Sequence, residues 1–157
     1  MLIPQLLEAL PTKAFASSLI DALIHSVESY ISPKANSLTR MFSVRATELI
    51  IHGMKKLTIL GSEYRMDFAG ELLLASTLAG VAFGDAGCGA VHAMSYPLGE
   101  KYHAPHGLSN YCLFLAVLRE YKHAGGGTRL AELESMLAPA LECGPEKVYD
   151  ELEKLLE

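Results

Sequence analysis

Apolar and polar positions alternate along most of this chain with the period of an α-helix. Between residues 14 and 31, apolar side chains recur every three or four positions, which places them on one face of an amphipathic helix. These positions are Phe15, Leu19, Leu23, Val27 and Tyr30. Because a residue before proline disfavours helical backbone, Ser32-Pro33 predicts the end of this helix.

Two further helices are predicted in the first half of the chain. One begins at an N-cap formed by Asn36 or Ser37, runs to about residue 51 and ends at Gly53. The next spans residues 63–83, where alanine, glycine and serine recur and allow close helix packing. We interpret both helices as scaffold.

Glycine and proline divide the following segment. A turn at residues 85–89 leads into a short helix that carries His92 and Tyr96 on one face until Pro97-Leu98-Gly99 breaks the pattern. A loop or helix entry follows at residues 102–107. Within it, proline stiffens the backbone immediately before His106, so this imidazole is predicted to be held in place.

The last third of the chain is also helical in pattern. Residues 109–121 are apolar nearly all round, as expected of a central helix, and two charged helices follow near 128–137 and 145–156. The triplet Gly125-Gly126-Gly127 follows a helix rather than a strand, which favours an interhelical loop over a phosphate-binding loop. No segment alternates as a strand does and no repeat is visible. The sequence predicts one all-α domain over residues 1–157.

Composition and charge narrow the possible partners. Half of the residues are hydrophobic and mean hydropathy is +0.24, high for a domain with 20% charged residues, so we expect another chain or a second copy to cover part of the apolar surface. A net charge of -5 and a pI near 5.7 argue against nucleic acid and anionic membranes as partners.

Cysteine usage and the absence of targeting signals indicate a cytoplasmic protein. The three cysteines, Cys88, Cys112 and Cys143, show no paired spacing, and the first residues lack the pattern of a signal peptide. The uncharged stretch at residues 72–84 is shorter than the ~20 apolar residues of a membrane span. We expect free thiols and a buried helix.

Asp21 and His25 are the first candidates for chemistry. They are four residues apart on the first helix, so both side chains lie on one face and can point at a single atom. A surface hydrogen bond between them is the alternative interpretation. With His92 and His106 they form a set of one carboxylate and three imidazoles, which suits iron(II) or zinc.

Three motifs in order along the chain resemble the iron-dependent (group III) alcohol dehydrogenases. They are FASSLIDALIHSVESY at residues 15–30, SPKAN at 32–36, and G-x-x-H-x-x-x-Y-P-L-G-x-x-x-x-x-P-H-G at 89–107. Within the family, the Ser-Tyr-Pro-Leu-Gly and Tyr-His-x-Pro-His-Gly runs are most similar to the NAD-dependent 4-hydroxybutyrate dehydrogenase branch.

The resemblance implies roles for individual residues. It implies that Asp21, His25, His92 and His106 bind one catalytic metal, Fe²⁺ or Zn²⁺. Many members of the family have a second histidine where Tyr96 stands, so this tyrosine is expected to hydrogen-bond the substrate instead. From its nearness to His106 in the sequence, His103 is a candidate to contact a metal ligand or relay a proton, with an exposed loop histidine as the alternative. Leu19 replaces a common glycine and is expected to crowd the approach to the metal.

The resemblance also implies a division of labour between domains. The family pairs an N-terminal α/β domain, which binds the nicotinamide cofactor, with a helical metal domain, and this sequence resembles the helical half alone. We therefore expect a part of an enzyme that acts on an alcohol or aldehyde and that uses NAD bound by another domain. We expect it to form a homo-oligomer or to associate with a complementing nucleotide-binding domain. The alternative hypothesis is a non-catalytic, truncated helical fragment that self-associates.

Overall fold

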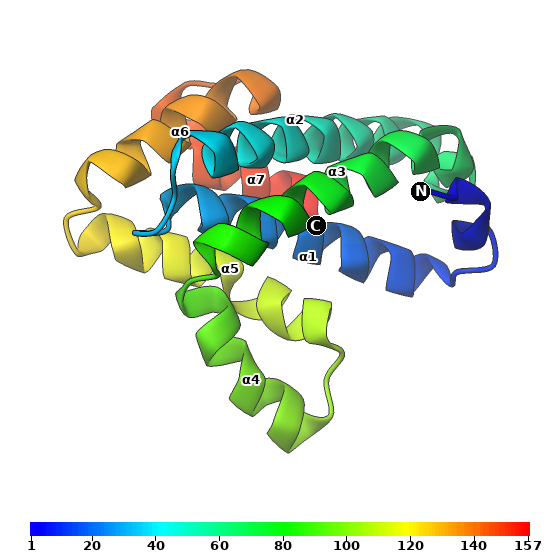
Figure 1. The fold of residues 1–157 in the computed structure, drawn as a ribbon, viewed down its shortest axis with the longest axis horizontal. Helices are drawn as coiled ribbons and strands as arrows, with labels where there is room; N and C mark the ends of the chain where they lie inside the picture. The colour runs from blue at the N-terminus through cyan, green and yellow to red at the C-terminus, as the bar shows by residue number, and fades with distance from the viewer.

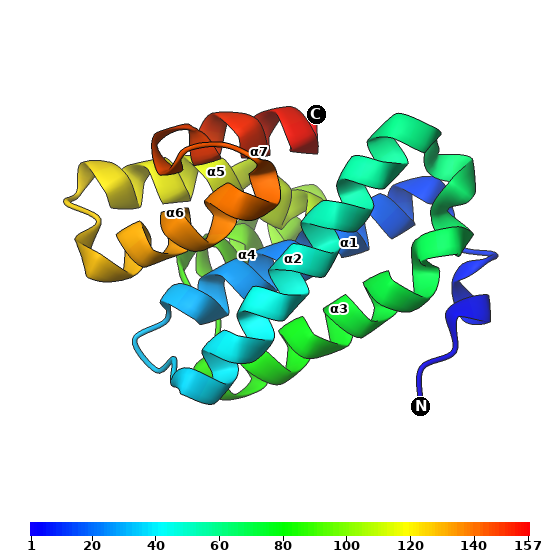
Figure 2. The same ribbon diagram turned by 90° about the horizontal axis from the view of Figure 1, so that it is seen from above.

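The chain folds into seven α-helices and contains no β-strand (Figure 1). The computed structural model describes residues 1–157. The three longest helices pack side by side, as Figure 2 shows, and are α1 (Thr12–Ile31), α2 (Ser37–Leu60) and α3 (Arg65–Ala86). Short 3-10 turns precede α1 and α3, at η1 (Pro4–Leu7) and η2 (Ser62–Tyr64). The predicted all-α class is confirmed.

The second half of the chain adds four helices. In Figure 1, α4 (Ala90–Tyr102) projects from the bundle, and α5 (His106–His123) returns beside it to pack on α1. The remaining elements are α6 (Gly127–Leu141), η3 (Pro145–Lys147) and α7 (Val148–Leu156). Gly125 and Gly126 lie between α5 and α6 and Gly127 begins α6, so the triplet joins two helices, as predicted.

Helix α1 lies at the centre of the fold and packs against α2, α3, α5 and α6. Its apolar face is buried as the periodicity predicted, with Leu23 and Val27 fully buried. Its small polar side chains also face neighbours, since the hydroxyls of Ser26 and Thr47 are hydrogen-bonded over 2.8 Å between α1 and α2. The helix that carries Asp21 and His25 is therefore held on several sides.

Helix α5 is less central than its apolar sequence predicted. Phe114 and Leu118 are fully buried on the side that faces the core, whereas Cys112 and Ala116 are exposed on the other side. Small or apolar residues on the exposed side of α5 made the sequence look apolar all round, although these residues are not buried. The core position belongs to α1.

The predicted end of the second helix at Gly53 is wrong. Helix α2 continues to Leu60, and Gly53 is buried within it, where an added Cβ would lie 2.6 Å from Leu72 Cδ2. The glycine thus permits close packing of α2 on α3. The helix ends instead at Gly61, whose φ of 103° suits a residue without a side chain. The predicted N-cap is correct, because Asn36 forms a capping box with Thr39.

The predicted break of the fourth helix at Pro97 is also wrong, because α4 continues to Tyr102. Proline removes one backbone donor and leaves the carbonyl of residue i−4, here Ala93, without its helical partner. Both Pro97 and Ala93 are exposed, so water can hydrogen-bond that carbonyl. The exposed position explains why the helix tolerates the proline.

Helix α3 together with η2 is long and apolar enough to cross a membrane by length and composition. In the fold its alanines, including Ala75 and Ala79, are buried and the helix packs on α1 and α2. Leu74 and Val81 are exposed on its outer side. The prediction of a buried helix therefore holds for one face only, and a cytoplasmic location stays a prediction.

Candidate metal centre

The centre begins with two side chains on α1. Asp21 and His25 lie on one face of the helix, and His25 Nδ1 is 3.6 Å from Asp21 Oδ2. The two side chains are 18% and 17% exposed, respectively. Burial lowers the pKa of His25 below its ordinary value, which favours the neutral imidazole that binds metals.

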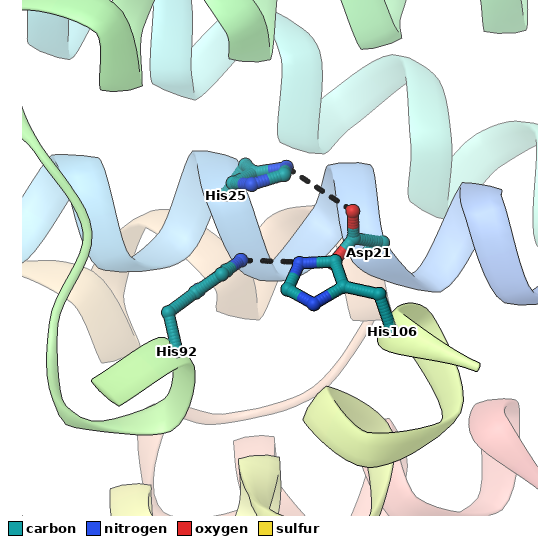
Figure 3. A group of neighbouring side chains, drawn as sticks. All are labelled: Asp21, His25, His92 and His106. Atoms are coloured by element: carbon teal, nitrogen blue, oxygen red, sulfur yellow. Dashed lines mark ion pairs between the residues drawn. The ribbon is translucent and has the colours of Figure 1, made fainter. Parts of the chain in front are cut away.

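Two more imidazoles approach the same carboxylate from α4 and α5. The Nε2 atoms of His92 and His106 lie 3.6 Å and 3.7 Å from Asp21 Oδ1. Figure 3 shows the four side chains pointing toward one another. One donor atom from each of Asp21, His25, His92 and His106 lies within 4.8 Å of the others. We call these four residues the Asp/His cluster.

The start of α5 is pressed tightly onto α1. Pro105 is the N-cap of α5, and His106 is its first residue. Gly107 packs against Ser17 so closely that an added Cβ would lie 2.4 Å from the Ser17 carbonyl oxygen. The proline and the close contact together fix the position from which His106 projects, as the sequence predicted for Pro105.

His92 has one satisfied and one unsatisfied ring nitrogen. Its Nδ1 lies 2.7 Å from Glu28 Oε2, whereas its Nε2 is buried and has no hydrogen-bond partner. Buried polar atoms are rarely left unpaired, and each one calls for an explanation such as a ligand. A divalent cation beside Asp21 would satisfy Nε2, so the residues present fit a metal ion.

Acidic neighbours change the protonation of His92. Burial disfavours its charged form, but contacts with Asp21, Cys88 and Glu28 raise its pKa to about 11. For Asp21, burial raises the pKa, but the nearby imidazole of His92, the hydrogen bond from Asn110 and the charges of His25 and His106 bring it below its ordinary value. Without a metal ion, these neighbours therefore favour the protonated form of the His92 ring.

Asn110 and Phe83 complete the surroundings of the cluster. The buried Asn110 amide donates a 2.7 Å hydrogen bond to Asp21 Oδ1, and its nitrogen lies 3.1 Å from His106 Nε2. The Phe83 ring stacks on His25 at 4.2 Å between centroids, and His92 stacks on the other side at 4.4 Å. These contacts limit the rotation of Asp21 and His25.

The cluster is reachable from the surface. His106 is 49% exposed, and a pocket of about 780 Å³ opens beside Asp21 and His106. Its walls come mainly from the N-terminal half of α1 and the start of α5. A cation and a small molecule can therefore approach the cluster without opening the core.

The chain is similar in sequence to known proteins. Residues 15–157 match the model of the Fe-containing alcohol dehydrogenase family, C-terminal. The chain belongs to the Fe-containing alcohol dehydrogenase family. It is 42% identical over 157 residues to 4-hydroxybutyrate dehydrogenase of Clostridium kluyveri, covering 100% of this chain and 42% of that protein. It is 39% identical over 116 residues to 1,3-propanediol dehydrogenase of Citrobacter freundii, covering 74% of this chain and 30% of that protein.

Solved structures of the family share the fold. A 1,3-propanediol oxidoreductase matches with a TM-score of 0.77 and 32% identity, over 98% of this chain and 40% of that one. The iron-containing alcohol dehydrogenase of Thermococcus thioreducens matches with a TM-score of 0.80 and 24% identity, over 98% of this chain and 39% of that one. The family resemblance is confirmed, and the chain spans about 40% of the length of these relatives.

The other residues predicted for the site lie at its edge or outside it. The Tyr96 ring centroid is 6.2 Å from that of His106, and Tyr96 is 66% exposed. His103 is exposed at the C-terminal end of α4, where its backbone is in the left-handed conformation. No hydrogen bond joins its side chain to the Asp/His cluster. Leu19 is buried in the hydrophobic core.

Two residues near the cluster escaped the sequence analysis. Glu28 is on α1, seven residues after Asp21 and three after His25, so a charged residue within the buried face was a visible signal. Asn110 lies one turn after His106 on α5 and shares its face. Both are buried polar residues that contact the cluster.

Proposed function

We propose that this chain is the metal-binding catalytic domain of an NAD-dependent alcohol dehydrogenase. The observation that carries the proposal is the convergence of one carboxylate and three imidazoles around the buried, unpaired Nε2 of His92. Asp21, His25, His92 and His106 would hold a divalent ion, Fe²⁺ or Zn²⁺. When bound, the ion supplies a Lewis acid for the alcohol or carbonyl oxygen.

The side chains of this domain position the reactants. Phe83 and His92 cover the two faces of the His25 ring, while the pocket beside Asp21 and His106 leaves the Asp/His cluster accessible from that side. Tyr96 stands at the edge of the cluster, where its hydroxyl can donate a hydrogen bond to a substrate oxygen. For His103 a proton-relay role stays a prediction.

The proposal extends to substrate and partner. The similarity to the 4-hydroxybutyrate dehydrogenase of Clostridium kluyveri supports 4-hydroxybutyrate as the substrate. NAD, which exchanges hydride with the substrate, would be held by a nucleotide-binding domain outside these 157 residues. We therefore expect these residues alone to give no NAD-linked turnover of 4-hydroxybutyrate. Steady turnover by this polypeptide would contradict that division of labour.

Metal content is the test of the proposal. The purified chain is reconstituted anaerobically with Fe²⁺ or Zn²⁺, freed of excess metal and measured by elemental mass spectrometry. We expect near-stoichiometric metal in the wild type and in the control His52→Ala, whose exposed histidine on α2 lies outside the cluster. His92→Ala should retain much less metal after the excess is removed, because only three of the four residues remain. Wild-type chain that stays metal-free after reconstitution would contradict the proposal.

The exposed apolar side chains favour a second candidate function, a non-catalytic helical unit that self-associates. Leu74 and Val81 on α3, Met94 on α4 and Leu108 on α5 are all exposed. This candidate predicts an oligomer by sedimentation velocity whose melting temperature does not respond to a chelator. A melting temperature that falls with chelator and recovers with metal would contradict it.

A further inference from the structure

A single buried carboxylate, Glu28, contacts both the backbone and the ring of His92. Glu28 lies on α1 and is 1% exposed. Its Oε1 accepts a 2.7 Å hydrogen bond from the Val91 amide. Its Oε2 accepts a 3.4 Å hydrogen bond from the His92 amide and lies 2.7 Å from His92 Nδ1. Both carboxylate oxygens are therefore occupied within the first turn of α4.

These contacts fix the orientation of the imidazole. The two amide contacts hold the start of α4 against α1, and the ring contact sets the rotation of His92 about its side-chain bonds. With Nδ1 turned toward Glu28, Nε2 faces Asp21 Oδ1 at 3.6 Å. Helix α1 thus supplies two members of the Asp/His cluster directly and orients a third through Glu28.

We propose that Glu28 is a positioning residue of the metal centre, which holds His92 as an Nδ1–H donor so that its Nε2 is the ligand atom. The proposal rests on the proposed function. A carboxylate that accepts the distal N–H of a metal-binding histidine fixes its tautomer and raises its basicity. Loss of such a partner weakens metal binding by about 10- to 100-fold.

The variant Glu28→Gln separates this role from simple packing. Glutamine keeps the shape of the side chain and one acceptor oxygen for the Val91 amide. Its amide group, turned toward His92, donates to Nδ1 instead of accepting from it. The proton is then favoured on Nε2, the atom that the metal needs.

The test measures Zn²⁺ affinity by competition with a chelating indicator, together with ¹⁵N NMR of the histidine rings in the Zn²⁺-loaded protein. Four chains are compared: wild type, Glu28→Gln, His92→Ala and the double variant. We expect Glu28→Gln to fold like the wild type and bind Zn²⁺ about 10- to 100-fold more weakly. In the His92→Ala background, the same change should have no further effect, because its target is gone.

The outcomes distinguish the two proposals. Wild type that takes up no Zn²⁺ overturns the proposed function and the role of Glu28 with it. Wild type that binds Zn²⁺ while Glu28→Gln binds equally well overturns only the role of Glu28, as does an equal loss in the presence and absence of His92. The wild type alone is also decisive if the variant fails to fold, since Zn²⁺ bound through His92 Nδ1 in the NMR spectrum would overturn the inference.

Discussion

Gly107 and Ser17 lie in direct contact at the point where α5 meets α1, one residue after His106. There is no room for a side chain at position 107, since a Cβ there would lie 2.4 Å from the Ser17 carbonyl oxygen and 2.5 Å from the Ser17 Oγ. The carbonyl belongs to the backbone of α1 and cannot rotate away. The position of His106 relative to Asp21 therefore depends on a residue that has no chemistry of its own.

The variant Gly107→Ala should damage both stability and the metal centre. The added methyl group pushes α5 from α1, and overpacking of this kind costs about 1–3 kcal/mol. We expect a lower free energy of unfolding in urea and weaker Zn²⁺ binding, because His106 moves with α5. Gly84→Ala on α3 is the matched control, since nothing lies within 4 Å of its added Cβ. Equal effects of the two substitutions would contradict the close contact.

Asn110 is expected to matter through Asp21. The variant Asn110→Ala removes the 2.7 Å hydrogen bond to Asp21 Oδ1, and a hydrogen bond to a charged group contributes about 1.5–3 kcal/mol. Zn²⁺ affinity should fall because the carboxylate is free to rotate. Ser109→Ala, which removes a 3.3 Å hydrogen bond to the Pro105 carbonyl in the same helix, is the control. A variant that binds Zn²⁺ like the wild type would show that the carboxylate needs no support.

Two of the four ligand candidates could be paired from the sequence because their signal is local. Asp21 and His25 share a face by helix geometry alone. The proline before His106 was expected in a loop or helix entry ahead of a helix over 109–121, and in the structure it is the N-cap of α5. The convergence of these ligand candidates with His92 depended on the family resemblance, since no spacing along the chain determines how α4 and α5 meet α1. Glu28 and Asn110 carried local signals, a charge within the buried face of α1 and a position one turn after His106, but the sequence does not show that they contact the cluster.

The errors in the fold have a common physical cause. Gly53 and Pro97 were expected to end helices, as these residues do when local propensity decides. In the structure, packing against Leu72 favours a glycine inside α2, and exposure to water allows a proline inside α4. Propensity describes an isolated helix, whereas the contacts of the folded chain decided these two positions.

Removal of metal should lower the stability of the wild-type chain. A ligand that binds only the folded state at about 100 times its Kd adds about 2.7 kcal/mol, which corresponds to about 5–10 °C in melting temperature for a chain of this size. We expect this difference between Zn²⁺-loaded and EDTA-treated chain in thermal unfolding followed by circular dichroism. His25→Ala, which lacks one ligand of the cluster, should show a much smaller difference. A full difference in that variant would point to Zn²⁺ binding elsewhere.

The metal-free chain should lose stability as pH rises above neutrality, because of His92. Its pKa is about 11 in the folded chain against the ordinary 6.5, so between these values the folded state binds more protons than the unfolded state. Stability therefore falls with rising pH in this window, by at most about 1.4 kcal/mol per pH unit. Urea unfolding in EDTA at pH 7, 8 and 9 measures how the free energy of unfolding changes with pH. The same measurement on His92→Gln gives the contribution of the other groups, which is then subtracted. Parallel curves for the two chains would contradict the prediction. With saturating Zn²⁺, which takes the place of the proton, the difference in slope should disappear.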